Sequence, residues 1–250
     1  AMGPGLGLND DTQERVRQWY ASFPRVCILD ADGLNAFKHH SDLLAHHLGP
    51  RILTPHENEF ERLFGKLPDS LYDRAQRVKE VAIRLKVEIL LKGPISILAS
   101  SQGELSIYTQ GSSALARAGT GDILTGVLLA LSSRWLAPEL SFSLLNLGVW
   151  LHGMAAEITK ENSSEISMRS LEITDYLGAA VDHLLNLMTQ EGIEYGDALS
   201  SALSPIDESS IEDLDGFDLV DLDDLDDLDD LDDLDDLDDL DDLDDPNGSQ

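Results

Sequence analysis

The chain has 250 residues, enough for one or two domains, and a formal net charge of −31. Residues 1–206 hold 25 acidic and all 17 basic residues without a basic stripe, which excludes a protein that binds nucleic acid through its phosphates. The single cysteine, Cys27, excludes an internal disulfide, and the lack of a signal-peptide pattern or a membrane-length apolar stretch favours a cytoplasmic protein that binds no membrane.

Short apolar runs alternate with longer stretches of helical period along most of the chain. The expected elements, in chain order, are strand 26–29, helix 34–48, strand 51–53, a helix starting at Pro55 with Thr54 as its cap, helix 70–86, strand 87–91, strands 95–99 and 104–108, and helices 120–134, 139–160 and 168–189. Strands that alternate with helices predict an α/β fold, in which a parallel sheet is covered by helices.

The most informative segment is Gly119-Thr120-Gly121-Asp122, which opens the helix expected over 120–134. Glycines let backbone N–H groups approach a ligand, and a helix N-terminus attracts an anion. A carboxylate beside such a loop suits phosphoryl transfer, with Asp122 as the base for an attacking hydroxyl. Taken alone, the same residues would be favoured as a turn and a helix cap.

Polar residues follow three of the expected strands directly. They are Asp30, the segment Thr54–Glu57 and the segment Lys92–Ser96. Ligands of parallel sheets bind at the carboxyl ends of the strands, so we expect these residues to surround one site near the glycine loop.

Five segments resemble those of the nucleotide-dependent NAD(P)H-hydrate dehydratases, a branch of the ribokinase-like fold. They are GPGLG at 3–7, DADGLN at 30–35, LTPHENEF at 53–60, LKG at 91–93 and AGTGDILTG at 118–126, and their order and spacing agree over residues 3–187. The resemblance implies a three-layer α/β/α sandwich that restores hydrated NAD(P)H. In this reaction ATP or ADP phosphorylates the hydroxyl of the hydrated ring, which then leaves as phosphate.

The resemblance also implies roles for individual residues. Gly7 and His56 would contact the hydrated substrate, NAD(P)HX, and Asp122 would contact its ring hydroxyl and act as the base. The nucleotide site would be lined by Lys92, Gly93, Pro94, Ile95, Ser96 and Gly121. Gly119, Thr120 and Gly121 would form an anion hole. We expect ADP or ATP as co-substrate with Mg²⁺, and no metal site made by the protein itself.

Each of these side chains also has a purely structural interpretation. Taken alone, His56 would be favoured as a helix-start residue without a ligand, and Lys92 as a surface lysine. Asp30 and Asp32 could only bond loop amides, a common use of Asp.

Two pairs of histidines, His39/His40 and His46/His47, raise the question of a metal. They fall on the helix expected over 34–48, and neither a cysteine nor a further ligand accompanies them. We therefore favour an exposed helix face over a zinc site.

The chain departs from the family pattern at two places. It starts directly before Gly3, where family members have further strands, so we expect a sheet whose N-terminal strands are missing and whose edge is exposed. Such a fragment would be unstable, inactive or completed by another chain, which favours a homo-oligomer. Before the glycine loop, the family's Asn-Pro-Gly is replaced by residues 111–117.

The two predicted regions are a ribokinase-like domain over 1–190 and an acidic tail over 191–250. Residues 221–245 contain only 17 Asp and 8 Leu. A leucine at every third position forms no stripe on an α-helix, and the carboxylates repel, so we expect disorder at neutral pH. Docking, weak cation binding and repeat expansion without a role remain open for this tail.

Two rival functions are kept beside the dehydratase. The first is a ribokinase-like small-molecule kinase, which would leave a stable phosphoester. The second is a non-catalytic fragment or interaction module whose active part is the acidic tail. Nucleotide binding and the fate of the phosphate discriminate between the three.

Overall fold

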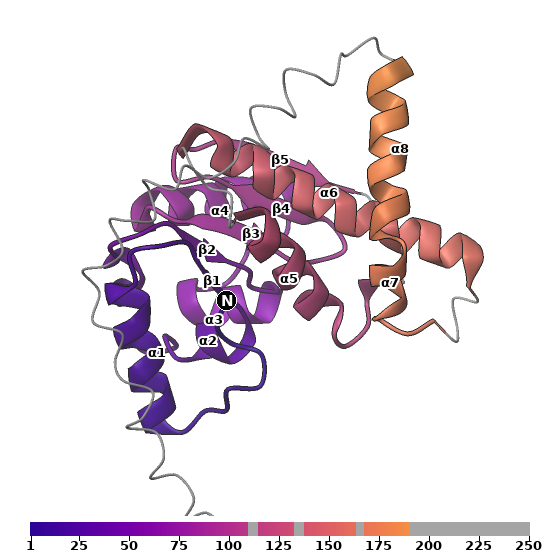
Figure 1. The fold of residues 1–250 in the computed structure, drawn as a ribbon. Helices are drawn as coiled ribbons and strands as arrows, with labels where there is room; N and C mark the ends of the chain where they lie inside the picture. The colour runs from indigo at the N-terminus through magenta and orange to yellow at the C-terminus, as the bar shows by residue number, and fades with distance from the viewer. Residues whose placement is uncertain (110–114, 133–137, 164–167, 191–250) are drawn as a thin grey trace, which may run out of the picture. The chain divides into compact units, whose positions relative to one another are not determined.

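The computed structural model describes residues 1–109, 115–132, 138–163 and 168–190 (Figure 1). Contacts divide the chain into two units, Ala1–Leu203 and Ser204–Gln250, and all described residues lie in the first. The acidic tail predicted over 191–250 and the altered segment before the glycine loop, from 111 to 114, lie outside the described residues.

A five-stranded sheet with the order β1-β2-β3-β4-β5 forms the centre of the first unit. Its strands are β1 (Cys27–Leu29), β2 (Arg51–Leu53), β3 (Glu88–Leu91), β4 (Ser96–Ala99) and β5 (Leu105–Tyr108). The first three are parallel, whereas β4 is antiparallel to both β3 and β5. The predicted parallel sheet is therefore a mixed one, because short connections return the chain directly from β3 to β4 and from β4 to β5.

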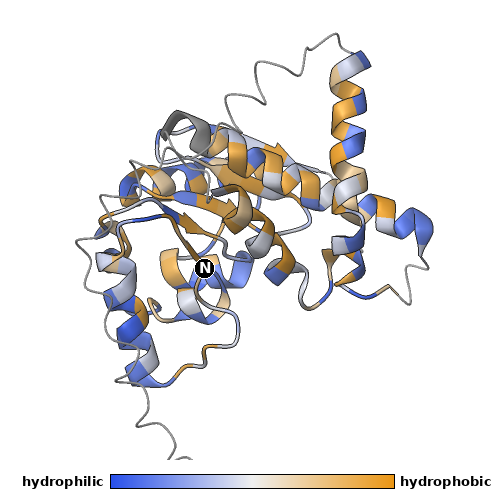
Figure 2. Ribbon diagram, in the orientation of Figure 1, coloured by the Kyte–Doolittle hydropathy of each residue, from blue (hydrophilic) through white to orange (hydrophobic). Residues whose placement is uncertain are grey.

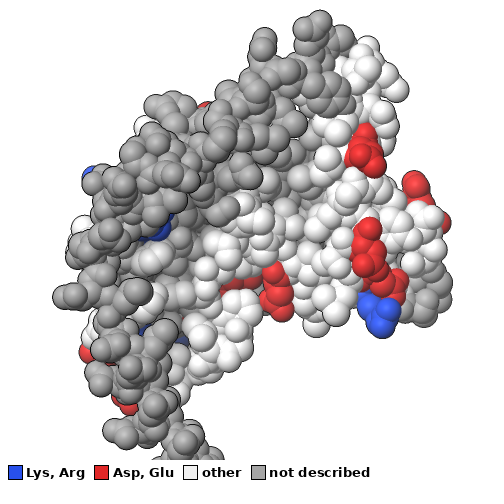
Figure 3. Space-filling model, in the orientation of Figure 1, with Lys and Arg blue, Asp and Glu red and all other residues white. Residues whose placement is uncertain are grey.

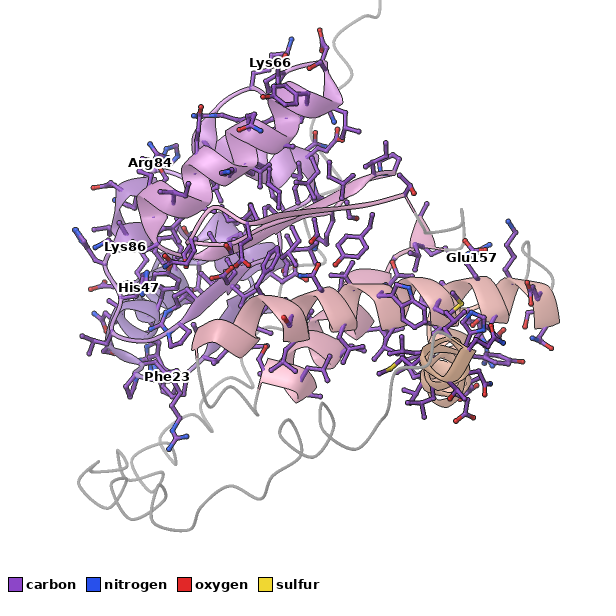
Figure 4. All side chains as sticks on the ribbon, turned by 90° about the horizontal axis from the view of Figure 1, so that it is seen from above. Phe23, His47, Lys66, Arg84, Lys86 and Glu157 are labelled. Atoms are coloured by element: carbon purple, nitrogen blue, oxygen red, sulfur yellow. The ribbon has the colours of Figure 1, made fainter. Side chains whose placement is uncertain are left out.

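Both faces of the sheet are buried, and alternate strand residues divide between them. Ile28, Ile52, Leu90 and Leu98 pack with helices α5 (Thr120–Ser132) and α6 (Pro138–Asn162). Leu29, Leu53, Ile89 and Leu91 pack with α1 to α4 on the other face. Figure 4 shows α4 (Leu71–Leu85) on one side of the strands and α5 and α6 on the other. Cys27, the only thiol, is buried in β1.

Helix α1 (Asp10–Ser22) was not predicted, because its sequence is largely polar (Figure 2). It is held by Val16 and Tyr20, its two buried residues. Asn9 caps it by accepting a hydrogen bond from the Thr12 N–H at 2.8 Å. At its far end, Arg51 donates to the carbonyl oxygens of Tyr20 and Phe23.

The long helix predicted over 34–48 is wrong. The segment instead forms a short helix α2 (Ala31–Asn35) and a 3-10 helix η1 (Ser41–Ala45). The early start of α2 follows from Asp30, whose side chain accepts a hydrogen bond from the Ala31 N–H. A Cβ on Gly33 would lie 2.6 Å from the Met2 carbonyl oxygen, so α2 is packed directly against the N-terminal segment.

The histidine pairs consequently do not share a helix face. His39 and His40 follow α2, and His46 and His47 follow η1. The His47 ring lies within hydrogen-bond distance of the carbonyl oxygens of Gly49, at 2.8 Å, and Leu85, at 3.2 Å. Within the described ranges, no group of three or more His, Cys, Asp and Glu could hold a metal ion.

The remaining helices follow the prediction closely, with one interruption. Helix α5 and helix α6 match the expected ranges, but the helix predicted over 168–189 divides into α7 (Glu172–Asp175) and α8 (Leu177–Gln190). Ile173 of α7 and Ala180 of α8 are buried in one apolar cluster with Leu151, Ala155 and Ala156 of α6, so both pieces pack against that helix. None of the helices in the described part of the chain is long and apolar enough to cross a membrane.

Candidate active site

The glycine loop ends in helix α5, as predicted, and its backbone needs glycine. Gly119 has a φ of +89°, a conformation that side chains disfavour. The Thr120 hydroxyl donates to the carbonyl oxygens of Leu115, at 2.7 Å, and Arg117, at 2.9 Å. These bonds hold the loop closed, while the first turn of α5 carries Asp122.

Asp122 lies on the exposed side of this turn and faces a pocket of about 540 Å³. The pocket is lined by Ala118, Gly119, Asp122, Ile123, Arg169, Ser170 and Leu171. Ser170 donates through its hydroxyl to the Ala118 carbonyl oxygen at 2.5 Å, which ties the segment before α7 to the glycine loop. Among described residues, the Asp122 carboxylate has neither an ion-pair nor a hydrogen-bond partner, so it is open to the pocket.

His152 supports the same loop from helix α6, and the sequence did not single it out. Its side chain is buried and hydrogen-bonded to the backbone of Thr120, and burial lowers its pKa to about 4. The imidazole is therefore neutral at physiological pH and adds no charge to the glycine loop. Within the described part of the chain, its Nε2 is buried without a hydrogen-bond partner.

Lys92 forms an ion pair with Asp30 at the carboxyl ends of β3 and β1. The Lys92 Nζ lies 2.5 Å from Asp30 Oδ1, and the two side chains are 21% and 3% exposed. Asp30 Oδ1 also accepts from the Ala31 N–H at 3.0 Å, as the structural interpretation predicted. Lys92 is thus more than a surface lysine, because it is tied to a buried carboxylate 62 residues earlier in the chain.

Helix α5 closes this cluster from the other side. The Thr125 hydroxyl donates to Asp30 Oδ2 at 2.9 Å, a role that was not predicted for Thr125 although it lies in the segment 118–126. A Cβ on Gly121 would lie 3.5 Å from Lys92 Nζ and 3.8 Å from Asp30 Oδ2. The structure therefore brings Lys92 and Gly121 together, and the ammonium group stands beside the first turn of α5.

His56 caps helix α3 (Glu57–Phe64), a role that the sequence assigned to Thr54. Its Nδ1 accepts hydrogen bonds from the N–H groups of Asn58 and Glu59, and the Glu59 side chain accepts from the His56 N–H. Thr54 instead donates to the Leu29 carbonyl oxygen within the sheet. His56 is also paired with Lys92 by a single parallel bridge, so the helix start adjoins the site.

Gly7 belongs to an exposed loop that reaches the same end of the sheet. Its N–H donates to Asp32 Oδ2 at 3.0 Å, so Asp32 bonds a loop amide as predicted. The loop is fixed at its start, where Gly3 has a φ of +146° and a Cβ would lie 1.7 Å from the Asp30 carbonyl oxygen. Only glycine fits this contact.

Pro94 and Ile95 line a second pocket of about 180 Å³ that does not include Asp122. Its other lining residues are Glu57, Asp69, Leu71, Arg74, Leu91 and Ile97. Arg74 Nη1 lies 2.5 Å from Glu57 Oε1 across this pocket. Gly93 packs against Glu57, and the Ser96 hydroxyl donates to the Gly93 carbonyl oxygen at 3.5 Å. Of the predicted nucleotide residues on the segment 92–96, Lys92 is thus the one that lies beside Gly121.

Charged groups are sparse on the surface around these elements. On the described surface visible in Figure 3, acidic groups are isolated, and Lys and Arg form no continuous patch there.

A family model described as NAD(P)H-hydrate dehydratase matches residues 1–178. The chain belongs to this family. The match covers all five segments that carried the resemblance, which is thereby confirmed.

The NAD(P)H-hydrate dehydratase family includes curated relatives that are longer than this chain. The bifunctional NAD(P)H-hydrate repair enzyme Nnr of Thermofilum pendens is 34% identical over 184 residues, which cover 72% of this chain and 34% of that protein. Nnr of Gloeobacter violaceus is 40% identical over 157 residues, covering 62% and 29%. The chain spans about a third of the length of the curated relatives it matches.

Solved structures support the same family. The ADP/ATP-dependent NAD(P)H-hydrate dehydratase of Bacillus subtilis, co-crystallised with ATP/Mg²⁺ and soaked with CoA, is 32% identical with a TM-score of 0.60, and the match covers 73% of this chain and 64% of that one. A ribokinase-like superfamily protein from Enterococcus faecalis V583, 22% identical with a TM-score of 0.56 and covering 73% and 62%, shares the fold. The predicted ribokinase-like α/β fold is confirmed at this level.

Proposed function

We propose that residues 1–190 form the catalytic unit of a nucleotide-dependent dehydratase that converts hydrated NAD(P)H, NAD(P)HX, back to NAD(P)H. The observation that carries the proposal is the position of Asp122, an unpaired carboxylate in the first turn of α5. It follows the glycine loop directly and belongs to the same helix turn as Gly121, which adjoins Lys92. A base, an anion-binding helix start and a cation are the groups that phosphoryl transfer needs.

The reaction proceeds in two steps. Asp122 takes the proton of the ring hydroxyl, whose oxygen attacks the terminal phosphorus of the nucleotide as the bond to the leaving nucleotide oxygen breaks. The new phosphate ester then leaves as inorganic phosphate with the electrons of its C–O bond, and loss of a ring proton restores the double bond. Phosphate is a far better leaving group than hydroxide, which explains why a nucleotide is consumed.

The other predicted residues divide between the two ligands. Gly119 and Gly121 would offer N–H groups to the transferred phosphate, with Lys92 as its cation. Thr120 was expected to join them, but its N–H donates to the Arg117 carbonyl oxygen at 3.4 Å. Gly93, Pro94, Ile95 and Ser96 continue from Lys92 and would line the nucleotide. His56 and Gly7 would face the hydrated ring, which agrees with their positions on the segments that adjoin Lys92 and Asp32.

Mg²⁺ would enter with the nucleotide. The described residues contain no cluster of three carboxylates, histidines or cysteines, whereas Mg²⁺ is commonly held by phosphates with one or two protein carboxylates. A site of that kind fits this chain, with Asp122 as the carboxylate in the first turn of α5, because both oxygens of Asp30 already accept hydrogen bonds. When bound, Mg²⁺ would neutralise charge on the phosphates.

The finer architecture is also a proposal. We infer a three-layer α/β/α sandwich whose sheet continues beyond β1, because Met2 pairs with Leu29 by a parallel bridge on the outer side of this edge strand. Further strands would extend that edge, supplied by an upstream segment or by another copy in a homo-oligomer. We assign the unit to the cytoplasm.

The test is an assay of the chain with NAD(P)HX and with ATP and ADP separately. Recovery of reduced-nicotinamide absorbance together with release of inorganic phosphate supports the proposal. A stable phosphoester on a hydroxylated substrate, without phosphate release, would identify a small-molecule kinase instead. If the chain is inactive, the same assay is repeated after fusing it to the N-terminal segment of the B. subtilis enzyme. Inactivity of this fusion with both nucleotides would refute the assignment.

A further inference from the structure

The Asp30 carboxylate joins three elements of the candidate site. Oδ1 accepts from Lys92 Nζ at the end of β3 and from the Ala31 N–H at the start of α2. Oδ2 accepts from the Thr125 hydroxyl on α5. The side chain is 3% exposed, and these three donors leave neither oxygen without a partner.

The partner of Asp30 is accessible on its other side. Lys92 retains 21% of its side-chain exposure, and its ammonium group adjoins the position that a Cβ on Gly121 would take. Thr125 lies one helical turn after Gly121, so the hydrogen bond to Asp30 fixes the same stretch of α5 that carries Gly121. The ammonium group and the helix start are therefore set relative to each other through one carboxylate.

A lysine ammonium on a four-carbon stem does not keep a defined place by itself. A charge-assisted bond to a buried carboxylate supplies that place before a ligand arrives, so less ordering is needed on binding. The three donors to Asp30 come from residues 31, 92 and 125, which only the folded chain brings together.

We propose that Asp30 is a positioning residue for phosphate recognition, which holds the Lys92 ammonium at the first turn of α5. The proposal rests on the proposed function in taking a nucleotide phosphate as the ligand. Asp30 itself does not touch the phosphate, since its two oxygens are occupied by Lys92, Ala31 and Thr125. All of its effect on the nucleotide must therefore pass through Lys92.

The experiment is a double-mutant cycle on the full chain, read by calorimetric titration with Mg·ATP and Mg·ADP. Asp30→Asn keeps the shape of the side chain and removes its charge, and Lys92→Met removes the ammonium. We expect each single variant to weaken nucleotide binding by about tenfold or more. The double variant should bind no more weakly than Lys92→Met alone, because Asp30 acts through Lys92. Asp42→Asn, which neutralises an exposed acid on η1, is the control for net charge.

A second measurement needs no nucleotide. Limiting acetic anhydride, followed by mass spectrometry, gives the acetylation rate of each lysine, with the exposed Lys66 (labelled in Figure 4) as the internal reference. We expect Lys92 to react slowly in the wild-type chain and several-fold faster in Asp30→Asn, with no change in Asp42→Asn. If Asp30→Asn does not fold, Thr125→Val replaces it, since loss of the Thr125 bond loosens the same carboxylate and should also raise the Lys92 rate.

The outcomes separate the two proposals. Independent losses that multiply in the double variant would overturn the positioning role, because Asp30 would then act without Lys92. An unchanged Lys92 acetylation rate in Asp30→Asn would overturn it as well. If neither the chain nor its fusion to the N-terminal segment of the B. subtilis enzyme binds either nucleotide, the proposed function is refuted, and phosphate recognition by Asp30 and Lys92 is refuted with it. Faster acetylation of Lys92 in Asp30→Asn, together with a double variant that binds nucleotide no more weakly than Lys92→Met, supports the positioning role.

Discussion

The guanidinium of Arg51 lies 5.0 Å from the centre of the Tyr20 ring, and its Nε donates to the carbonyl oxygen of the same tyrosine at 2.9 Å. Arg51 is 1% exposed, and it also donates to the carbonyl oxygens of Phe23, Arg25 and Pro50. The side chain of Arg51, at the start of β2, therefore donates hydrogen bonds to backbone carbonyl oxygens at the end of α1 and in the connection from α1 to β1.

We expect Arg51→Met to lower the free energy of unfolding by about 3 kcal/mol, because several buried carbonyl oxygens lose their donor. Arg51→Lys should restore little of this, since an ammonium cannot reproduce the planar set of donors. Urea denaturation followed by circular dichroism measures both variants, and Arg84→Met, at an exposed arginine of α4, is the control. If Arg51→Met lowers the free energy of unfolding as little as Arg84→Met does, water replaces the guanidinium as the hydrogen-bond donor to these carbonyl oxygens.

Glu88 predicts a pH dependence of stability. It is buried at the start of β3, where burial raises its pKa to about 6 although Ser101 donates to its Oε1. A folded-state pKa above the ordinary value of about 4.5 means that stability is fully present below pH 4.5 and is lost as the pH rises through 6. The loss amounts to about 2 kcal/mol by pH 8, at 1.36 kcal/mol per unit.

The matched variant is Glu88→Gln, which keeps an oxygen for Ser101 and has no charge to bury. We expect its melting temperature to exceed that of the wild type at pH 8 and to equal it near pH 4.5. Glu161→Gln, at an exposed glutamate on α6, should follow the wild type at both values. If the melting temperatures of Glu88→Gln and of the wild type change with pH in the same way between pH 4.5 and pH 8, Glu88 does not titrate as described.

Asp122→Asn tests the proposed base. Asparagine keeps the shape of the side chain but cannot take a proton, so nucleotide binding should persist while turnover falls by about 10²–10⁴-fold. The measurement is the rate of NAD(P)H recovery at saturating nucleotide, with Asp182→Asn on the exposed side of α8 as the control. Wild-type turnover in Asp122→Asn would leave Asp122 as no more than a helix-start residue.

His56 combines a cap with a proposed substrate contact, and two variants separate these roles. His56→Ala removes both, so it should cost about 1 kcal/mol of stability and weaken substrate binding. His56→Asn restores a side chain that caps well, so it should recover the stability but not the substrate affinity. If His56→Asn matches the wild type in KM for NAD(P)HX, the imidazole serves α3 alone.

Extending the sheet beyond β1 should stabilise the unit. The parallel bridge between Met2 and Leu29 marks where an additional strand would begin to pair. We expect fusion to the N-terminal segment of the B. subtilis enzyme to raise the melting temperature markedly and to favour the monomer in analytical ultracentrifugation. A chain that is already a highly stable, cooperatively unfolding monomer would contradict the proposed open edge.

Local patterns predicted the strands and the larger helices. Apolar runs bounded by polar residues predicted all five strands of the described sheet within about a residue. Helix α1 escaped prediction because Val16 and Tyr20 are its only buried residues, too few for a visible period. The helix expected over 34–48 failed for a tertiary reason, since close packing of Gly33 on Met2 and the side chain of Asp30 determine where α2 starts.

The sequence predicted single residues of the candidate site, but not the hydrogen bonds that join them. Asp122, Lys92 and the glycine loop stand out because each follows a recognisable local pattern. The bonds of Asp30 to Lys92 and Thr125 span 62 and 95 residues, a separation over which a single sequence carries no pairing signal. His152 was missed because a histidine on an apolar helix looks like any other core residue until its bond to Thr120 is seen.

The buried thiol of Cys27 has a practical consequence for experiments. It is the only cysteine of the chain, and burial raises its pKa, which keeps it from reacting with maleimides in the folded state. A cysteine introduced at an exposed position such as Asp42 or Asp182 would therefore be labelled alone, without removal of the native residue. Fluorescent probes attached there could report on nucleotide binding in an otherwise unaltered chain. The rate at which Cys27 itself is labelled would then measure how fast the chain unfolds.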